Sequence, residues 1–218
     1  MTERKKHWET VYETKTPDQV SWTQDIPQTS LDFINSFGLP KNANIIDVGG
    51  GDSNLVDHLI EAGYKNITVL DISGKAIERA KKRLGEKADS VIWIESDVTQ
   101  FTPDKSYDIW HDRATFHFLT SEDQINSYKN IVSNHVSGFM SIGTFSNNGP
   151  LKCSGLEISQ YTSDSLLDAF NESFELTNSI IEDHKTPFDT FQNFVFCGFK
   201  KNKDVPYFKR KNNISLYY

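Results

Sequence analysis

The sequence predicts an α/β fold of the Rossmann-like, doubly wound kind, with a mostly parallel seven-stranded sheet and an antiparallel C-terminal hairpin. Apolar runs alternate with helical patterns from residue 44 to residue 144, which is typical of a parallel sheet covered on both faces. The first run ends in Asp47 and breaks into Gly49-Gly50-Gly51, where glycine permits a sharp turn. Beyond residue 144, two segments alternate apolar and polar residues, as antiparallel strands do.

The segment before the first strand is predicted to be helical and aromatic. Trp8, Val11 and Tyr12 are three and four residues apart, so they share one face of a helix. Gly38 is a stop signal for a second, shorter helix, and an extended link containing Trp22 is expected between the two. The expected elements are a helix over residues 3–14, the link over residues 20–24 and a helix over residues 30–37.

The regular core follows, with strands and helices in alternation. Ser53 or Asp52 can cap the first helix, Ser73 the second and Ser121 the third, and a glycine follows each of the first two. Strands are expected at residues 45–48, 67–70, 91–94, 107–110 and 138–144, and helices at residues 53–62, 75–84 and 123–133.

The C-terminal part is predicted to depart from this alternation. It comprises a polar loop over residues 146–155, a short helix over 164–170 capped by Ser163, and strands over 174–181 and 190–199. We expect one domain, in which residues 1–40 form a lid, 41–145 the core, 146–199 the substrate-side loop and hairpin, and 200–218 a basic tail. The tail is either a solvated extension or a contact for phosphates or an acidic partner.

Composition excludes several classes of function. The net charge of −7 argues against general nucleic-acid binding, and no apolar run is long enough to cross a bilayer. The first residues lack the apolar core of a signal peptide, and Cys153 and Cys197 indicate two reduced thiols in a cytoplasmic protein. Histidines and cysteines lack metal-ligand spacing, so no metal is expected. We expect a monomer or weak dimer, and His184 is expected to face solvent.

The glycine loop predicts a nucleotide ligand without phosphates. Asn54 stands where a dinucleotide site has its third glycine, and Asp47 would lie unfavourably close to a pyrophosphate. A ligand with a cationic centre and an amino-acid tail tolerates that carboxylate. Asp71 ends the second apolar run, where an acid can hold the two hydroxyls of a ribose. These residues favour an adenosyl ligand over NAD.

Four strand ends carry a resemblance to a known family. The chain resembles class I S-adenosylmethionine-dependent methyltransferases over about residues 40–145, and the opening aromatic segments are similar to those of small bacterial-type members. Trp110-His-Asp-Arg-Ala is also similar to a segment of thiopurine-type thiol methyltransferases. The motifs that carry the family resemblance are Asp47-Val-Gly49-Gly-Gly51, Leu70-Asp71-Ile72-Ser73, Ser96-Asp97-Val98 and Tyr107-Asp-Ile-Trp-His-Asp112.

The resemblance implies S-adenosylmethionine as cofactor, S-adenosylhomocysteine as product, and a set of cofactor-binding residues. The glycine loop would cradle the methionine end, with Asp47 near its amino group, and Asp71 would bind the ribose. Asp97 would accept from the adenine amino group, and His111 would lie close to the sulfonium. The implied cofactor-binding residues are Trp22, Asp47, Gly49, Gly50, Gly51, Asp71, Ile72, Asp97, Val98 and His111.

Methyl transfer to a thiol, hydroxyl or ammonium can use a base, and the segment after the fourth apolar run supplies the catalytic candidates His111, Asp112 and Arg113. Arg113 is either a clamp for an anionic substrate group or the partner of Asp112 or another strand-end acid in a salt bridge. Substrate contacts are expected from Trp8, Tyr12, His117, Cys153 and Tyr161. For several of these the alternative is packing: a core position for the aromatic residues and His117, and an inert buried thiol for Cys153.

The leading expectation is an enzyme that moves a methyl group from S-adenosylmethionine to a small-molecule acceptor, with a thiol slightly preferred because of the Trp-His-Asp-Arg segment. A first alternative is a protein lysine methyltransferase, which needs an open groove for the lysine. A second is a non-catalytic module that binds the cofactor and regulates a partner.

Overall fold

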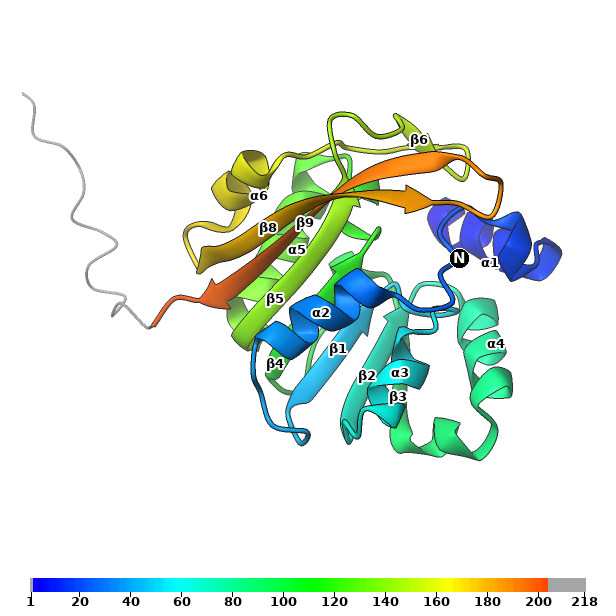
Figure 1. Cartoon of the computed structure of the whole chain (residues 1–218), viewed down its shortest axis with the longest axis horizontal. Coiled ribbons are helices and arrows are strands. Elements are labelled where there is room, and N and C mark those ends of the chain that lie inside the picture. Colours follow the sequence, from blue (N-terminus) through cyan, green and yellow to red (C-terminus); the bar gives the residue numbers. More distant parts are fainter. Residues whose placement is uncertain (1, 204–218) are drawn as a thin grey trace, which may run out of the picture.

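The computed structural model describes residues 2–203, and a seven-stranded sheet runs through its centre (Figure 1). The strand order is β3-β2-β1-β4-β5-β9-β8, in which β1 to β5 are parallel and β9 is antiparallel to both neighbours. This is the predicted doubly wound α/β fold with its C-terminal hairpin. The strands are β1 Asn44–Val48, β2 Asn66–Asp71, β3 Val91–Glu95, β4 Tyr107–Arg113, β5 Val136–Phe145, β8 Phe174–Lys185 and β9 Phe191–Lys201.

Helices cover both faces of the sheet, because neighbouring residues of each central strand are buried on opposite sides. Ile45 packs in a cluster with side chains of α2, α3 and α4, whereas Ile46 packs in another with side chains of α5 and α6. Both isoleucines are fully buried, as expected for a parallel strand between two helical layers. The helices are α1 Glu3–Thr14, α2 Gln28–Ser36, α3 Leu55–Glu61, α4 Gly74–Leu84, α5 Glu122–His135 and α6 Ser163–Phe170.

Local signals set most helix ends as predicted. The Ser73 hydroxyl accepts from the Ala76 N–H and caps α4, and Gly85 follows that helix at a φ of +58°. A reciprocal pair of hydrogen bonds between Ser121 and Gln124 begins α5. Near the N-terminus, α1 has the predicted bounds and lies beyond the carboxyl ends of β2 and β3, beside α4 (Figure 1).

Three expectations about local structure are wrong. Neither Asp52 nor Ser53 is the N-cap of α3, because Asn54 occupies that position and Asp52 is paired with arginines of α4. Residues 20–22 form a bend and a turn, so the link over 20–24 is not extended throughout. The loop over 146–155 contributes to a small hairpin, formed by β6 (Lys152–Cys153) and β7 (Leu156–Glu157).

Two further corrections concern the C-terminal half of the chain. Thr162, not Ser163, caps α6, because its hydroxyl accepts from the Ser165 N–H. His184 is only 4% exposed rather than solvent-facing, since its Nε2 lies 2.8 Å from the Ser21 carbonyl oxygen. Within residues 2–203, no helix has the length and apolar character needed to span a membrane. Most of the predicted basic tail, residues 204–218, lies outside the described residues.

Candidate active site

A cavity of about 290 Å³ lies at the carboxyl ends of the central strands. Ligands of open α/β sheets bind at this edge, where the strand order reverses on either side of the first strand. The glycine loop after β1 and the ends of β2 and β4 form its base, and α1 and residues 17–25 cover it. Residues 17–25 are named the strap below. The volume is near the lower end of the range of about 300–1,000 Å³ that small-molecule pockets span.

The glycine loop fits its surroundings only without side chains. Gly49 has a φ of +72° and donates its N–H to the Leu70 carbonyl oxygen at 2.7 Å. A Cβ on Gly49 would lie 1.9 Å from the Thr115 Oγ1, and one on Gly50 would lie 2.1 Å from the Asp47 Oδ2. The backbone of this loop therefore borders the cavity directly.

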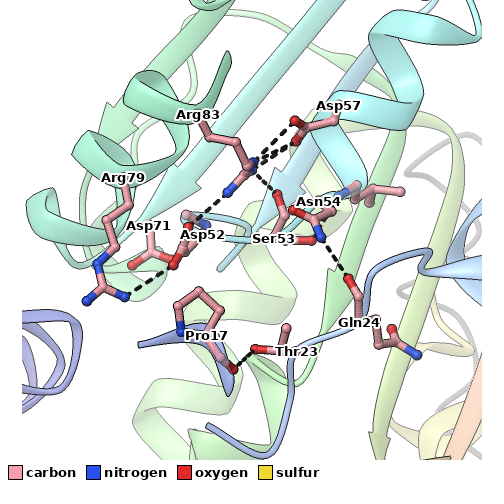
Figure 2. Close-up of polar contacts among 12 residues, drawn as sticks. Pro17, Thr23, Gln24, Asp52, Ser53, Asn54, Asp57, Asp71, Arg79 and Arg83 are labelled. Atoms are coloured by element: carbon pink, nitrogen blue, oxygen red, sulfur yellow. Dashed lines mark hydrogen bonds and ion pairs between the residues drawn. The ribbon is translucent and has the colours of Figure 1, made fainter. Parts of the chain in front are cut away.

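Two arginines of α4 hold the loop from outside (Figure 2). Arg83 Nη1 donates to Asp52 Oδ1 at 2.9 Å, and its Nη2 donates to the Ser53 carbonyl oxygen at 2.8 Å and to Asp57 at 2.9 Å. Arg79 lies 3.4 Å from the other oxygen of Asp52. This cluster was not predicted from the sequence, although Arg79 and Arg83 are four residues apart on one helix face. The cluster links the position of the loop to that of α4.

Asp71 ends β2 with its carboxylate bound by backbone. Its Oδ2 accepts from the Gly51 N–H at 3.0 Å, and its Oδ1 accepts from the Ser73 N–H at 2.8 Å. Burial raises the pKa of Asp71 to about 6, and these two hydrogen bonds oppose that rise. Each oxygen retains acceptor capacity, so the side chain can still receive hydroxyl groups. Asp71 and Ile72 both line the cavity, whereas Gly51 lies behind Asp71.

Asp97 lies in the cavity wall next to the lid helix. Its Oδ1 accepts from the Thr99 N–H at 2.9 Å and from the Thr99 hydroxyl at 2.7 Å. Its Oδ2 is 3.6 Å from Arg4 of α1, so the lid reaches the loop after β3. Val98 lies in the same wall. The structure thus brings the residues expected around ribose and adenine to one side of the cavity.

His111 and Asp47 form a buried pair in the floor of the cavity. They lie opposite each other on β4 and β1, with His111 Nδ1 2.7 Å from Asp47 Oδ1, and both side chains are 3% exposed. A carboxylate only accepts, so Nδ1 donates in this hydrogen bond, and the neutral form of the ring has its lone pair on Nε2. Asp47 Oδ2 and His111 Nε2 are both buried without a hydrogen-bond partner among residues 2–203. Both residues line the cavity, and these two atoms have hydrogen-bonding capacity that the described residues do not use.

Asp112, expected as a catalytic candidate, does not line the cavity. The strand continues to Arg113 rather than ending at Trp110, so alternation turns Asp112 to the face opposite His111. Its carboxylate accepts from the Tyr128 hydroxyl at 2.7 Å and from the backbone N–H groups of Thr115 and Phe116. Burial raises the pKa of Asp112 to about 6. Its contacts hold the turn after β4.

Arg113 lines the other side of the cavity. Its Nη1 donates to the Trp22 carbonyl oxygen at 3.0 Å, and its guanidinium carbon lies 5.0 Å from the centre of the Phe194 ring. The expected ion pair with Asp112 is not formed, because the two side chains leave the strand on opposite faces. Burial lowers the pKa of Arg113 to about 10. Its Nε and Nη2 are buried without a hydrogen-bond partner among residues 2–203.

Of the three expected substrate contacts after β4, only Cys153 borders the cavity. Its thiol is free, and burial raises its pKa to about 12. His117 stacks on Phe145, with ring centroids 4.6 Å apart, and burial lowers the pKa of His117 to about 3. Tyr161 packs against Phe116 in the core. The structure therefore places His117 and Tyr161 behind the cavity wall.

Aromatic side chains of the lid surround the entrance. The Trp8 ring centre is 5.7 Å from that of Trp22, 6.2 Å from that of Tyr12 and 5.1 Å from that of Phe118. All four residues line the cavity. Trp8, Tyr12 and Trp22 thus pack on one another and also line the cavity. The two expectations for them, packing and contact with a ligand, are therefore compatible.

Glu9 fastens the lid to α4. Its carboxylate accepts from the Ser73 hydroxyl at 3.1 Å and from the N–H groups of Gly74 and Lys75 at 2.9 and 3.1 Å. These N–H groups belong to the first turn of α4, where an anion is stabilised by the helix dipole. Glu9 was not identified from the sequence, in which it is one of several charged residues on a surface helix.

The strap is held from both sides of the cavity. Asn54 of the glycine loop donates to the Gln24 carbonyl oxygen at 3.0 Å (Figure 2). On the other side, Gln192 of β9 donates to the Ser21 hydroxyl at 3.2 Å, next to the contact of His184. Asn54, expected only as a replacement for glycine, therefore ties the strap to the loop. Within the described chain, no three His, Cys, Asp or Glu side chains are grouped closely enough to hold a metal ion.

Comparisons with known proteins agree with this architecture. Residues 45–135, less than half of the chain, match a family model described as a methyltransferase domain. The chain is 32% identical over 136 residues to malonyl-(acyl-carrier protein) O-methyltransferase 1 of Ilyobacter polytropus, and the match covers 61% of this chain and 49% of that protein. It spans 17% of a mouse eEF1A lysine and N-terminal methyltransferase, at 25% identity over 55% of this chain. Mouse EEF1A lysine methyltransferase 2 is 24% identical, with 97% of this chain and 84% of that protein covered.

Solved structures share the fold at low sequence identity. N-methyltransferase NodS from Bradyrhizobium japonicum, solved in complex with S-adenosylhomocysteine, superposes with a TM-score of 0.68 at 14% identity, over 89% of this chain and 98% of that one. The shared sheet and the matched model both include the strand ends that form the cavity floor. Residues 45–135 thus match a methyltransferase domain, and the chain shares its fold with solved methyltransferases.

Proposed function

We propose that this protein is a methyltransferase that uses S-adenosylmethionine and methylates a small-molecule acceptor. The observation that supports it best is the set of unfilled ligand contacts in the cavity. Asp47 Oδ2 and His111 Nε2 are buried without partners in the described part of the chain, beside a glycine loop that has no room for side chains. Asp71 and Asp97 offer acceptors further along the same wall. A methionine amino group, a ribose and an adenine amino group meet complementary atoms at these positions.

The proposal assigns a task in binding to each group of residues in the cavity. Asp47 Oδ2 would receive the amino group of the cofactor, the backbone of Gly49 and Gly50 would lie along its methionine end, and Asp71 would hold the ribose hydroxyls. Ile72, Asp97 and Val98 would enclose the adenine, and Trp22 would cover the site. When bound, S-adenosylmethionine supplies a methyl group activated by its sulfonium.

The chain's own contribution to the chemistry would be orientation, exclusion of water and removal of a proton. The aromatic side chains of α1 and the strap close the cavity from solvent. The contact with Asp47 orients the His111 ring so that, in its neutral form, Nε2 would accept the proton of a thiol, hydroxyl or ammonium acceptor. Asp112 would not contact the reactants, and its role would be to hold the turn after β4 in place.

The roofed shape of the site supports a small acceptor. Trp8, Tyr12, Trp22 and Phe118 meet over the cavity, which leaves little room for a backbone segment of a protein substrate. A protein lysine methyltransferase is the second candidate, because the match to mouse EEF1A lysine methyltransferase 2 extends over 97% of this chain. The proposal also treats residues 1–40, 41–145 and 146–199 as parts of one domain.

Calorimetry tests the cofactor proposal directly. S-adenosylhomocysteine should bind the purified protein, and NAD should bind much more weakly. Equal or tighter binding of NAD would overturn the proposal. A screen of thiols, amines, phenols and purified elongation factor 1A with methyl-labelled cofactor then separates the acceptors. Labelling of small molecules supports the leading candidate, labelling of the protein supports the second, and binding without any transfer indicates a non-catalytic module.

A further inference from the structure

Arg113 lies on the side of the cavity away from the residues expected to bind the nucleoside. Asp71 ends β2 and Asp97 lies just after β3, whereas Arg113 ends β4. In the sheet, β1 lies between β2 and β4. Cys153, from β6, borders the same side as Arg113. The sheet order therefore separates a nucleoside side from a β4 side, with the Asp47–His111 pair near the middle.

Arg113 differs from the other arginines that line the cavity. Arg4 pairs with Asp97, and Arg83 pairs with Asp52 and Asp57. In the part of the chain that the structure describes, Arg113 forms no ion pair and donates one hydrogen bond, to the Trp22 carbonyl oxygen. Its Nε and Nη2 are both buried and unpartnered. A buried guanidinium in this state is an incomplete binding group.

The unpartnered edge has the geometry of a carboxylate site. Nε–H and the adjacent N–H of Nη2 point in parallel along one edge of the planar guanidinium, which matches the two oxygens of a carboxylate. The other edge is fixed, because Nη1 contacts the strap and the plane packs on Phe194. The free edge is therefore held in a defined orientation in the cavity wall.

The surroundings combine this cation with apolar side chains. Ala114, Phe118, Trp22 and Cys153 line the cavity near Arg113, and the buried thiol is protonated at neutral pH. Glu182 of β8 is the acid that most favours the charged form of Arg113, but the two do not form an ion pair, and Glu182 does not line the cavity. An acceptor with a carboxylate on a small apolar or aromatic body complements these groups. The positive charge of Arg113 disfavours a lysine side chain at the same place.

We propose that the methyl acceptor is a small carboxylic acid, and that Arg113 binds its carboxylate through Nε and Nη2. The inference rests on the proposed methyltransferase function, because it names the acceptor class of that site. The nucleophile of such an acceptor would lie towards His111, and its carboxylate would lie towards the strap and β6.

Matched pairs of acceptors test the proposal. The wild-type protein, saturated with S-adenosylmethionine, is assayed with the 4-mercapto, 4-amino and 4-hydroxy derivatives of benzoate and of benzamide. Binding of benzoate, benzamide and phenyl phosphate to the protein saturated with S-adenosylhomocysteine is measured by calorimetry. We expect benzoate to bind roughly 10- to 100-fold more tightly than benzamide. Whichever benzoate derivative is methylated should show the same preference in kcat/KM over the matching benzamide derivative. Tighter binding of phenyl phosphate than benzoate would assign the site to a phosphate rather than a carboxylate and overturn the proposal.

Three variants assign the preference to the guanidinium. Arg113→Gln should abolish the preference for benzoate, and Arg113→Lys should retain only part of it, because an ammonium is not a two-pronged donor. Glu182→Gln, outside the cavity, should tighten benzoate binding, since it removes the competing negative charge. Equal binding of benzoate and benzamide, absence of binding by both, or a preference that survives Arg113→Gln would overturn the proposal.

The affinity for S-adenosylhomocysteine separates this result from the proposed function. If the wild type binds S-adenosylhomocysteine but shows no preference for the carboxylate, only the acceptor inference fails. If the wild type does not bind S-adenosylhomocysteine, the proposed function fails first. The Arg113 variants should keep their cofactor affinity within a few fold, and a larger loss would show that Arg113 serves the cofactor instead.

Discussion

His111 Nδ1 lies 2.7 Å from Asp47 Oδ1, and this contact joins two neighbouring strands at the floor of the cavity. It sets the tautomer of the neutral histidine, whose other nitrogen is buried and has no partner among residues 2–203. The same carboxylate leaves its second oxygen for a ligand. In the proposed site, Asp47 would bind the amino group of the cofactor and His111 would remove a proton from the acceptor. These two roles can be separated by mutation.

His111→Asn should separate proton removal from binding. The asparagine amide can still donate to Asp47, but no atom replaces Nε2. We expect kcat to fall by about 10²- to 10⁴-fold for an acceptor that must lose a proton, with the affinity for S-adenosylhomocysteine changed only a few fold. His135→Asn, at the end of α5 and outside the cavity, is the matched control. Unchanged turnover in His111→Asn would remove this residue from the chemistry.

Cofactor binding should weaken in acid because of Asp71. Burial raises the pKa of this carboxyl to about 6, so it is ionised at pH 7.5 and largely protonated at pH 5. A ligand that binds the ionised form must then compete with a proton, and its affinity falls as the pH falls through 6. Calorimetric titration with S-adenosylhomocysteine between pH 5 and 8 measures this change. Asp71→Asn should lower the affinity by about 1.5–3 kcal/mol at pH 7.5 and flatten the profile around pH 6, and tighter binding in acid would contradict the assignment.

Glu9→Ala should loosen the lid without touching the cavity. It removes three hydrogen bonds to the start of α4, which we expect to cost about 1–2 kcal/mol of unfolding free energy, as for a lost helix cap. Release of S-adenosylhomocysteine should become faster. Glu13→Ala, on the same helix, loses only an exposed contact of 3.9 Å with Lys75 and should change either quantity little. Urea unfolding and stopped-flow tryptophan fluorescence measure the two effects, and equal effects of the two variants would refute the anchor.

Gly49→Ala should destabilise the glycine loop by more than the strain of its positive φ alone, because the new Cβ would also clash with a neighbouring side chain. Gly49 and Gly63 both have positive φ, at +72° and +86°, so alanine strains either backbone by about 1–2 kcal/mol. Only at Gly49 does the new Cβ meet another atom, 1.9 Å from the Thr115 Oγ1. We expect Gly49→Ala to lose cofactor binding and to be the less stable variant, as measured by calorimetry and thermal unfolding. Comparable losses in Gly63→Ala would show that the clash is not the cause.

Tyr128→Phe should destabilise the turn after β4. The hydroxyl donates to Asp112 at 2.7 Å and accepts from the Trp110 indole at 2.9 Å, and all three residues are fully buried. Its removal leaves a buried donor and a buried carboxylate oxygen unpaired, which we expect to cost about 1–3 kcal/mol in urea unfolding. Tyr64→Phe, which removes the hydroxyl of another buried tyrosine, should cost less than half as much. A smaller loss for Tyr128→Phe than for Tyr64→Phe would contradict the role given to this network.

Features that depend on neighbouring residues, such as strand ends, helix caps and the glycine loop, were predicted from the sequence. The end of β2 at Asp71 and the cap at Ser73 are set by neighbouring residues, and they appear in the structure as expected. The glycine loop was predicted for the same reason. The mostly parallel sheet with its antiparallel hairpin was also predicted, because strands that alternate with helices are typical of a doubly wound fold.

Contacts between distant segments could not be predicted in this way. Asp47 and His111 are 64 residues apart, and Glu9 and Gly74 are 65 apart, so each pair depends on strand register or helix placement. Asp112 was misjudged because strand parity, rather than proximity in sequence, decides which side chain faces the cavity. His184 was misjudged because the strap that buries it lies 163 residues away.

The attachment of the lid has a kinetic consequence. Glu9 is fastened to the first turn of α4, and the strap to side chains of the loop and the hairpin, so the closure is made of contacts within the chain itself. The rate at which α1 and the strap would open is then determined by contacts within the chain rather than by contacts with the ligand. The opening rate would be an upper limit on the dissociation rate of any ligand in the cavity. S-adenosylmethionine and S-adenosylhomocysteine would then dissociate at similar rates when opening is the slow step. Turnover under such a limit would depend on residues that never meet either reactant.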